Sequence, residues 1–458
     1  MTTDTIAAIA TGMSNAGISI IRISGDDVLS LIDKLYRSKK GSKILSKEDS
    51  HTIHYGYIVD GDEIIDEVMV AIMRAPATYT REDVVEINCH GGIVVTRKVL
   101  ELVLRNGARI AEPGEFTKRA FLNGRIDLSQ AEAISDIIQA KNELALKNSV
   151  NQLRGGEKDI IKKLRDSILY DIAYIEAALD DPEHMSLDGF DNKLIKNISK
   201  EEEIIAKLIR EARNGKIIKE GIKTVIIGKP NAGKSSLLNW LVGEERAIVT
   251  DIAGTTRDTL EETINLSGIT LNIVDTAGIR KTHDVIEKIG VNKAVKIASD
   301  ADLIIFVIDS STNLDENDEE IFTMIENKKA IILLNKSDLN KKVLLDEIQA
   351  ISSKPVIQIS VKDSSGLEKI EQQIKDMFFS GEITLNEDIY ITNERHKEEL
   401  ERAIQSLKLV KQSVDDGMSE DFYTIDLMNA YEALGRILGE NVEEDLVNMI
   451  FKEFCMGK

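Results

Sequence analysis

The sequence predicts a multidomain protein of α/β and α type: an N-terminal α+β domain, a helical domain in two separate parts, and a P-loop α/β domain inserted between those parts. Three observations predict this. The 458 residues exceed what one hydrophobic core normally holds. A glycine-rich run of the form GxxxxGKS lies near the middle of the chain. Amphipathic helical patterns flank it on both sides.

The first part, residues 1–118, alternates short β-type runs with turns. Residues 18–23, 68–72 and 84–87 are rich in Val and Ile, and a helix is expected over 93–105, after a pair of glycines. This mixture predicts an α+β domain.

Helical periodicity begins after Pro113-Gly114, and we assign residues 119–215 to the first part of the helical domain. Ser129 and Glu132 have the spacing of a capping box, and the helical pattern that follows continues past Leu144 to Val150. Further helices are expected over 157–179 and over 192–212, the last ending at Gly215.

The second helical part is assigned to residues 380–458. Its apolar residues fall on helical faces that need partners, as the first part's do, so one discontinuous domain accounts for both. The faces are formed by Leu400, Ile404, Leu407, Val410 and Val414, and by Leu427, Leu434, Ile437 and Leu438. Residues 216–379 remain as the inserted domain.

The glycine-rich run, Gly228 to Ser235, follows a β-type run and precedes a helical one, which is the context of a phosphate-binding loop. Backbone N–H groups of such a loop and the positive end of its helix face the β-phosphate. Lys234 is expected to reach the β- and γ-phosphate oxygens as a catalytic group. Ser235 is expected to bind Mg²⁺.

Three further signals follow: the first senses the γ-phosphate and holds a Mg²⁺ water through Asp275, and the other two identify the base as guanine. A strand ending at Val274 leads into Asp275-Thr276-Ala277-Gly278, the DxxG signal. A strand over 330–334 leads into Asn335-Lys336-Ser337-Asp338, which fits NKxD, and Asp338 can accept N1–H and the N2 amino group of guanine. Adenine offers neither donor, so a buried carboxylate there would reject it. The loop at Ser360-Val361-Lys362 can donate to guanine O6, and GTP is therefore the expected ligand.

A switch segment is expected at 250–258, where Thr256 is the second Mg²⁺ contact. The residues expected to contact GTP are Asn231, Ala232, Gly233, Lys234, Ser235, Ser236, Thr250, Asp251, Ile252, Ala253, Gly254, Thr255, Thr256, Asp275, Thr276, Ala277, Gly278, Asn335, Lys336, Asp338, Ser360, Val361 and Lys362.

Ile279 follows the DxxG signal, where small signalling GTPases have the glutamine that orients the attacking water. Glu287 is the best alternative for that role, although its spacing is also that of an ordinary solvated helix carboxylate. No arginine finger is evident. The side-chain carbonyl of Asn231 can instead hold a monovalent cation against the phosphates, and K⁺ in the finger position is our hypothesis.

Composition narrows the remaining possibilities. The chain is 42% apolar and 30% charged, as in soluble globular proteins, and shows neither a signal peptide nor a long apolar run, so we expect a cytoplasmic protein without a membrane span. The net charge of −21 argues against a surface that binds nucleic acid throughout. The two cysteines, Cys89 and Cys455, give no disulfide framework or zinc spacing.

With these parts in order, the chain resembles the family of tRNA uridine-5-carboxymethylaminomethyl modification GTPases (MnmE/TrmE) over essentially its full length. The stretches that carry the resemblance are Asp4-Thr5-Ile6-Ala7-Ala8, Arg22-Ile23-Ser24-Gly25, His90-Gly91-Gly92, Pro113-Gly114-Glu115-Phe116, Leu128-Ser129-Gln130-Ala131-Glu132-Ala133, the Ras-like GTPase signals, and the terminal Phe454-Cys455-Met456-Gly457-Lys458.

The resemblance implies a function that the residues alone do not. Such proteins modify C5 of the wobble uridine (position 34) of certain tRNAs with an aminomethyl or carboxymethylaminomethyl group, and they use GTP hydrolysis, stimulated by K⁺, to drive a conformational change. A tetrahydrofolate derivative, in its 5,10-methylene or 5-formyl form, supplies one carbon from the N-terminal domain, which also forms a homodimer. The implied partner is a flavin- and NADH-dependent protein of the MnmG/GidA family, in a heterotetramer or larger complex.

By position, the resemblance also implies site residues. Glu287 becomes the group that positions water, and Cys455 could take part in the modification chemistry or be structural. Folate contacts fall on Arg22, Glu86, Arg125 and Lys458, and K⁺ ligands on Asn231, Thr250, Ile252 and Thr255.

A second interpretation remains open: a K⁺-dependent GTPase switch that acts as an RNA- or ribosome-assembly factor without folate chemistry. The N-terminal domain and the terminal Cys-Met-Gly-Lys favour the first interpretation. Folate binding by the isolated chain would separate the two.

Overall fold

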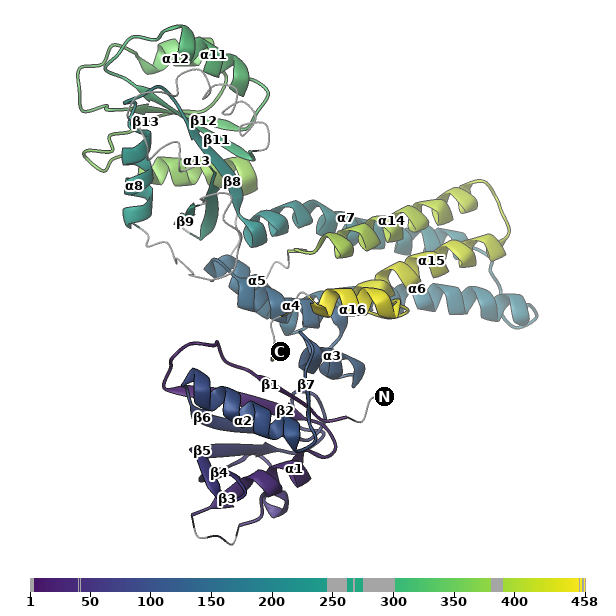
Figure 1. Cartoon of the computed structure of the whole chain (residues 1–458). Coiled ribbons are helices and arrows are strands. Elements are labelled where there is room, and N and C mark those ends of the chain that lie inside the picture. The colour runs from purple at the N-terminus through teal and green to yellow at the C-terminus, as the bar shows by residue number, and fades with distance from the viewer. Residues whose placement is uncertain are drawn as a thin grey trace. The chain divides into compact units, whose positions relative to one another are not determined.

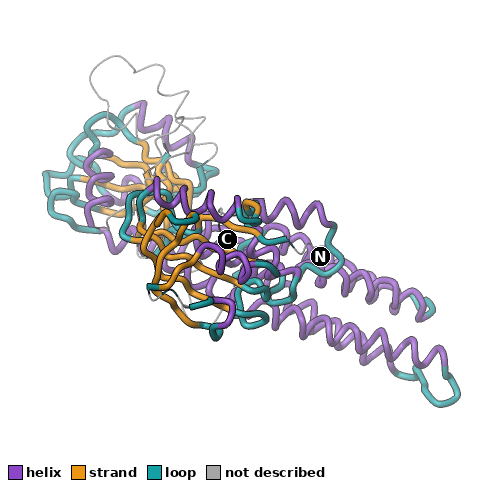
Figure 2. The backbone as a smooth tube through the Cα atoms, turned by 60° about the horizontal axis from the view of Figure 1, so that its bottom comes forward, coloured by secondary structure: helices purple, strands orange, loops and turns teal. Residues whose placement is uncertain are grey.

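The computed structural model describes residues 4–39, 41, 43–244, 262–266, 268–274, 301–379, 390–452, 454 and 457. Figure 1 labels most of their helices and strands, and Figure 2 colours helices purple and strands orange. The chain divides into two compact units. The first comprises Met1–Ile138, Gln152–Gly189 and Ser406–Lys458, and the second comprises Gln139–Asn151 and Phe190–Gln405.

The first unit contains a seven-stranded sheet in the order β3-β4-β5-β6-β2-β1-β7. Neighbouring strands are antiparallel except for the parallel pair of β1 and β7. The strands are β1 (Ile6–Ile9), β2 (Ile18–Ser24), β3 (Tyr36–Ser38), β4 (Thr52–Asp60), β5 (Glu63–Met73), β6 (Val84–His90) and β7 (Arg109–Ile110).

Two helices, α1 (Val28–Leu35) and α2 (Ile93–Arg105), cover one face of this sheet, and a 3-10 turn, η1 (Leu45–Lys47), packs beside α1. Their apolar side chains bury the inward residues of the strands, such as Ile21 and Ile87. The other face leaves Ile53, Tyr55 and Met69 between 42% and 68% exposed on the neighbouring strands β4 and β5. The sheet therefore has one covered face and one partly open face.

Helices α6 and α15 of the first unit pack together, and an ion pair connects α6 to Glu440, just beyond the end of α15. Arg165 on α6 makes two 2.6 Å contacts with the carboxylate of Glu440, and its guanidinium lies 4.1 Å from the ring of Tyr431 on α15. A Cβ added at Gly435 would lie 3.1 Å from that guanidinium, so the glycine makes room for it. The helices are α3 (Glu115–Leu122), α4 (Leu128–Gln139), α6 (Gly156–Asp180), α15 (Glu420–Leu438) and α16 (Glu444–Lys452).

The second unit contains a six-stranded sheet in the order β13-β12-β11-β8-β10-β9, parallel except for the edge strand β9. Helices lie on both faces, and the central strand β11 is buried along its whole length. The elements are β8 (Ile222–Ile227), α8 (Lys234–Glu244), β9 (Glu262–Leu266), β10 (Ile269–Ile273), β11 (Leu303–Asp309), α11 (Glu316–Ile325), β12 (Ala330–Asn335), α12 (Leu345–Ile351), β13 (Val356–Gln358) and α13 (Leu367–Phe379).

The described part of the chain contains three further helices: α5 (Glu143–Leu153), α7 (Phe190–Glu220) and α14 (Glu394–Asp415). The N-terminal α+β part, the helical segments and the P-loop α/β part are all present, which confirms the predicted fold class. No described helix is long and apolar enough to span a membrane.

Two expectations about helix ends are wrong. Helix α7 passes through Gly215 and ends at Glu220, before Gly221 with a φ of +84°. Gly215 is needed for another reason: a Cβ there would lie 2.2 Å from the carbonyl oxygen of Ile391. The helical pattern over 129–150 also breaks, because α4 ends at Gln139 and α5 starts at Glu143.

The expected capping box at Ser129 and Glu132 is also wrong, because both residues lie inside α4 and are buried. Asp127 is the capping residue: its Oδ1 accepts from the N–H of Gln130 at 2.9 Å, and Oε1 of Gln130 accepts from the N–H of Asp127 at 3.1 Å. The same reciprocal pattern therefore starts two residues earlier.

Candidate functional site

The phosphate-binding loop joins β8 to α8, as predicted. Gly228 has a φ of +144°, and a Cβ there would lie 2.2 Å from the carbonyl oxygen of Val307. Gly233 has a φ of +101°, and its Cβ would lie 2.2 Å from Nδ2 of Asn335. Both positions therefore require glycine, for conformation and for space.

Lys234 folds back along this loop. Its Nζ donates to the carbonyl oxygens of Gly228 and Lys229, each at 2.7 Å. Burial lowers the pKa of the Lys234 ammonium. Ser235 and Ser236, exposed in the first turn of α8, and Asn231, exposed with a φ of +61°, border the same loop.

Asn335, at the end of β12, connects two parts of the predicted nucleotide site. Its Nδ2 donates to the carbonyl oxygen of Ala232 at 2.9 Å, and its Oδ1 accepts from the N–H of Val361 at 3.4 Å. The structure thus brings the phosphate loop and the predicted guanine loop together through one buried amide.

The predicted base-reading groups also meet. Oδ1 of Asp338 accepts from the hydroxyl of Ser360 at 3.0 Å, and Nζ of Lys362 lies 3.9 Å from Oδ2 of the same carboxylate. These contacts orient the carboxylate beside the loop that was expected to reach guanine O6.

Sequence reasoning missed Asp309, the last residue of β11. It pairs with Nζ of Lys336 at 2.6 Å and accepts from the N–H of Ser311 at 2.9 Å. Burial opposes the charged form of Asp309, but the bonds from Lys336 and Ser311 prevail and lower its pKa. The carboxyl ends of parallel strands meet at the same edge of a sheet. The position of Asp309 at the end of an apolar run was therefore a signal that could have placed it near the nucleotide site.

Many predicted residues of the nucleotide site lie outside the described residues. They are Thr250, Asp251, Ile252, Ala253, Gly254, Thr255, Thr256, Asp275, Thr276, Ala277, Gly278 and Glu287.

The predicted folate residues gather in the first unit. Arg22 on β2 lies opposite Glu86 on β6, and Nε of Arg22 contacts Oε1 of Glu86 at 2.8 Å. Both side chains are about one fifth exposed, at 21% and 22%. The pair is therefore mostly buried but still partly exposed to solvent.

Tyr79 lies between two of the predicted cations. The guanidinium of Arg125 is 4.7 Å from the centre of the Tyr79 ring, and that of Arg22 is 5.8 Å away. The Tyr79 hydroxyl lies 2.8 Å from Oγ1 of Thr117, and burial raises the Tyr79 pKa. Sequence reasoning missed this tyrosine, because it lies in a loop before β6 with no recognisable pattern around it.

The end of the chain reaches this cluster. The carbonyl oxygen of Gly457 accepts from Nη1 of Arg22 at 3.1 Å. Gly457 has a φ of +84°, and a Cβ there would lie 2.5 Å from the carbonyl oxygen of Ile9. The predicted residues Cys455 and Lys458 lie outside the described residues, but the described neighbours Phe454 and Gly457 contact the N-terminal part of the first unit.

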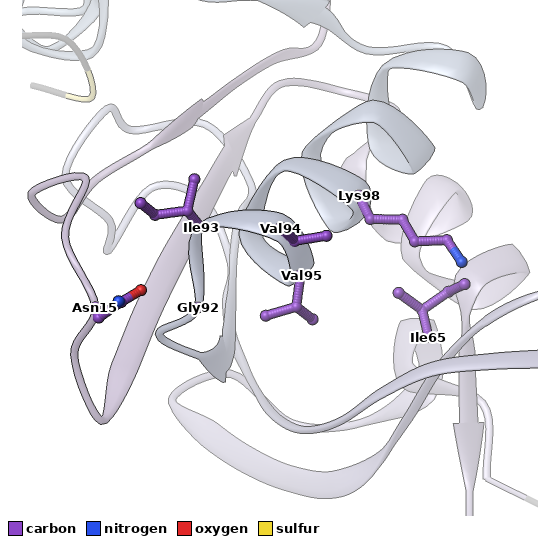
Figure 3. A pocket seen from close by; sticks show the side chains of 7 residues that line it. All are labelled: Asn15, Ile65, Gly92, Ile93, Val94, Val95 and Lys98. Carbon is purple, nitrogen blue, oxygen red and sulfur yellow. The ribbon is translucent and has the colours of Figure 1, made fainter.

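An open cavity of about 730 Å³ lies elsewhere in this unit, at the start of α2. Figure 3 shows its lining residues, which are Asn15, Ile65, Gly92, Ile93, Val94, Val95 and Lys98. None is a predicted site residue, and the charge of Lys98 is paired with Glu63. The cavity does not offer the set of charged groups that gathers at Arg22.

The doubly covered sheet, the glycine-dependent loop and the NKxD motif beside it together define a P-loop protein of the guanine-nucleotide-binding class.

Comparison with known proteins makes this class more specific. Residues 5–125 match the family model for the GTP-binding protein TrmE N-terminus, and residues 128–455 match the model for the MnmE helical domain. The tRNA modification GTPase MnmE of Lachnoclostridium phytofermentans is 63% identical, with both chains fully covered. The protein of that name from Thermoanaerobacter pseudethanolicus is 51% identical over 100% of both chains. The one from Enterococcus faecalis is 48% identical over 99% of this chain and 98% of its own.

This chain therefore belongs to the MnmE family of tRNA modification GTPases. Among solved structures, the G domain of the T. maritima FeoB iron transporter aligns with 34% of this chain and 98% of its own length, at 30% identity and a TM-score of 0.27, a likeness too limited to carry an argument.

Proposed function

We propose that the chain hydrolyses GTP and, with a flavin- and NADH-dependent partner of the MnmG/GidA family, adds an aminomethyl or carboxymethylaminomethyl group to C5 of the wobble uridine (position 34) of certain tRNAs. A tetrahydrofolate derivative, in its 5,10-methylene or 5-formyl form, supplies one carbon. The observation that carries the folate part is the meeting of Arg22, Glu86 and Arg125 at Tyr79, beside the C-terminal Gly457.

The proposed GTP binding and hydrolysis rest on residues of the phosphate loop and of the NKxD motif. Gly228 and Gly233 let the backbone N–H groups approach phosphate oxygens closely. Lys234 leaves the loop carbonyls that it now contacts and donates to the β- and γ-phosphates. Asp338 accepts the two guanine donors that adenine lacks.

Two cations complete the proposed nucleotide site. Mg²⁺ takes oxygen ligands, and the exposed hydroxyl of Ser235 at the start of α8 fits one of them, with Thr256 as the second. K⁺ fits the side-chain oxygen of Asn231, with groups of Thr250, Ile252 and Thr255, and supplies positive charge where an arginine finger would act. Glu287 is proposed to position the attacking water.

The cluster at Arg22 suits a folate. Glu86 can accept from the N–H edge of the pteridine, and the half-buried Tyr79 offers a ring surface beside Arg22. Arg125 and Lys458 suit the carboxylates of the glutamate tail. Cys455 lies between Phe454 and Gly457 in the sequence, and we propose that it takes part in the modification chemistry.

We also propose that the chain forms a homodimer through the N-terminal part, is cytoplasmic, and binds tRNA and its flavin-dependent partner in a heterotetramer or larger complex. The open sheet face at Ile53, Tyr55 and Met69 supports the homodimer, because exposed apolar patches commonly mark protein interfaces. Replacing Met69 with Asp should shift sedimentation from dimer to monomer, and an unshifted dimer would argue for another interface.

The central test is calorimetric titration of the full chain with 5-formyltetrahydrofolate. Wild type should bind, and Arg22→Ala should lose at least about tenfold in affinity, because Glu86 loses its charged partner. Arg105→Ala is the matched control, since Arg105 pairs with Asp60 on an exposed surface of the same domain.

Two accompanying measurements cover the rest of the proposal. Unmodified wobble uridines in a deletion strain, restored by wild type but not by Arg22→Ala, would support the tRNA chemistry. No folate binding together with unchanged wobble uridines would favour an assembly GTPase instead. Equal hydrolysis rates in K⁺ and in Na⁺ would remove K⁺ from the mechanism.

A further inference from the structure

The short break between α4 and α5 contains a buried residue, Asn142, which is only 7% exposed. Its Oδ1 accepts from the N–H of Ala145 at 2.7 Å, so the side chain caps the start of α5. In a capping residue that faces solvent, water would satisfy the remaining hydrogen-bond donors. Asn142 is buried inside the second unit, so the N–H donors of its side-chain amide need partners in the protein.

Both donors of that amide are used. Nδ2 of Asn142 donates to the carbonyl oxygen of Ile218 at 3.0 Å and to Oγ1 of Thr270 at 2.7 Å. Ile218 lies in the last turn of α7, where carbonyls have no partner within the helix. Thr270 lies on β10 and is 1% exposed. One side chain therefore joins α5, the end of α7 and a strand of the parallel sheet.

Apolar contacts strengthen the same junction. A Cβ added at Gly268, in the turn between β9 and β10, would lie 3.3 Å from Cδ1 of Leu144. Ala145 belongs to the same buried cluster as Leu271 and Ile273 of β10. The first turn of α5 is thus part of the core of the sheet domain.

The hairpin that α5 contacts has a special place in the chain. Strand β9 begins at Glu262, shortly after the predicted switch segment 250–258, and β10 ends at Ile273, directly ahead of Val274 and the predicted DxxG signal. The hairpin therefore connects the two segments expected to respond to the γ-phosphate.

The other end of α5 is held by a different element. Nε2 of Gln152 donates to the carbonyl oxygen of Ser129 at 3.1 Å, and Nε2 of Gln130 donates to that of Leu153 at 2.9 Å. Residues 152 and 153 belong to the first unit, whereas the start of α5 belongs to the second. Helix α5 thus begins among the residues of the second unit and ends among those of the first.

We propose that α5 transmits the nucleotide state from the β9–β10 hairpin to the helical part, and that Asn142 and Thr270 are the positioning residues that couple them. This rests on the proposed GTP hydrolysis. A shift of β10 that broke the Asn142–Thr270 bond would leave buried polar groups without partners, so α5 follows the hairpin instead.

The test measures hydrogen exchange of the α5 amides in the full chain, in K⁺ buffer, with GDP and with GDP plus aluminium fluoride. Wild type should show an exchange difference between the two states. Thr270→Val removes the hydroxyl with little change in shape and should reduce that difference at least threefold. GTP hydrolysis should keep its KM and stay within about threefold in kcat, because no group at the nucleotide changes.

Three further variants make the result specific. Thr270→Ser keeps the hydroxyl and should restore the exchange difference. Thr323→Val makes the same change at an exposed threonine of α11 whose hydroxyl bonds Glu319 at 3.0 Å, and should behave as wild type. Asn142→Ser keeps an oxygen that can cap α5 but not the reach to Thr270. Asn142→Ser should therefore reduce the exchange difference as Thr270→Val does, and it replaces Thr270→Val in the test if that variant is unstable.

The outcomes separate this inference from the proposed function. Identical α5 exchange in both nucleotide states of wild type, or an undiminished difference in both Thr270→Val and Asn142→Ser, overturns the coupling. A wild-type chain that fails to hydrolyse GTP contradicts the proposed function, whatever the exchange of α5.

Discussion

The phosphate loop takes its ligand groups from one continuous segment, Gly228 to Ser235, whereas the cluster at Arg22 takes its groups from β2, β6, a loop and the end of the chain. In the proposed nucleotide site the loop acts mainly through backbone N–H groups, because Gly228 and Gly233 leave room for the close approach of a ligand. The proposed folate site acts through charged and aromatic side chains.

This difference teaches where each site is vulnerable. A backbone site depends on local conformation, and few substitutions within the segment are tolerated. A site assembled from distant side chains depends on the packing that brings its segments together. Gly114 is one such packing position, because a Cβ there would lie 2.5 Å from the carbonyl oxygen of Phe451. The predictions below probe this contrast, starting with the largest effect.

Lys234→Ala should have the greatest effect. The variant loses the one loop side chain expected to donate to the β- and γ-phosphates, so kcat for GTP should fall about 10²–10³-fold. Steady-state phosphate release measures it. Folate affinity should stay at the wild-type value, and a parallel loss of folate binding would contradict the independence of the two regions.

Asp338→Asn should reduce GTP affinity by about 10²-fold, because a charged acceptor for two guanine donors becomes neutral. Affinity for XTP should rise, since the new amide N–H can donate to the 2-oxo group of xanthine. Competition with a fluorescent guanine nucleotide measures both. Unchanged preference for GTP over XTP would show that Asp338 does not read the base.

Glu115→Gln tests the packing beneath the assembled site. Glu115 is buried, so burial raises its pKa, but bonds from Arg109, the N–H of Glu112 and Arg119 prevail and lower the pKa below 4.5. The charged form thus stabilises the fold above the unfolded-state pKa, and this stability is lost as pH falls through the lower folded-state pKa.

The variant should lose about 1.5–3 kcal/mol at pH 7. The loss should shrink as pH falls below the usual glutamate pKa of about 4.3. Thermal unfolding of wild type and variant at pH 7 and pH 3.5 measures this. Glu63→Gln, at an ion pair whose carboxylate is 63% exposed, is the control and should change little at either pH. A loss at Glu115 that is independent of pH would point to shape rather than charge.

Arg125→Ala should have the smallest effect. Arg125 is exposed, so its proposed ion pair with the glutamate tail is worth about 0.5–1 kcal/mol, and folate affinity should fall about two- to fivefold. Arg125→Lys should recover most of it. A loss as large as that of Arg22→Ala would mean that the two arginines have equal parts in the site.

Local pattern predicted much of the P-loop domain, because its strands are continuous apolar runs and its motifs are contiguous. The same reasoning failed where a tertiary contact determines where a helix ends. Gly215 looked like a helix end, but it is a point where the backbone near Ile391 comes close to α7. The helix expected over 129–150 breaks where Asn142 finds partners at Ile218 and Thr270, residues far along the chain.

The sequence by itself determined the phosphate loop, the guanine-reading motifs and the fold class, since short-range spacing and periodicity encode them. Only the tertiary structure placed Tyr79 between Arg22 and Arg125, joined Asp309 to Lys336, and brought Gly457 to the N-terminal sheet. These contacts join segments that are separated along the chain, so no local pattern of residues records them.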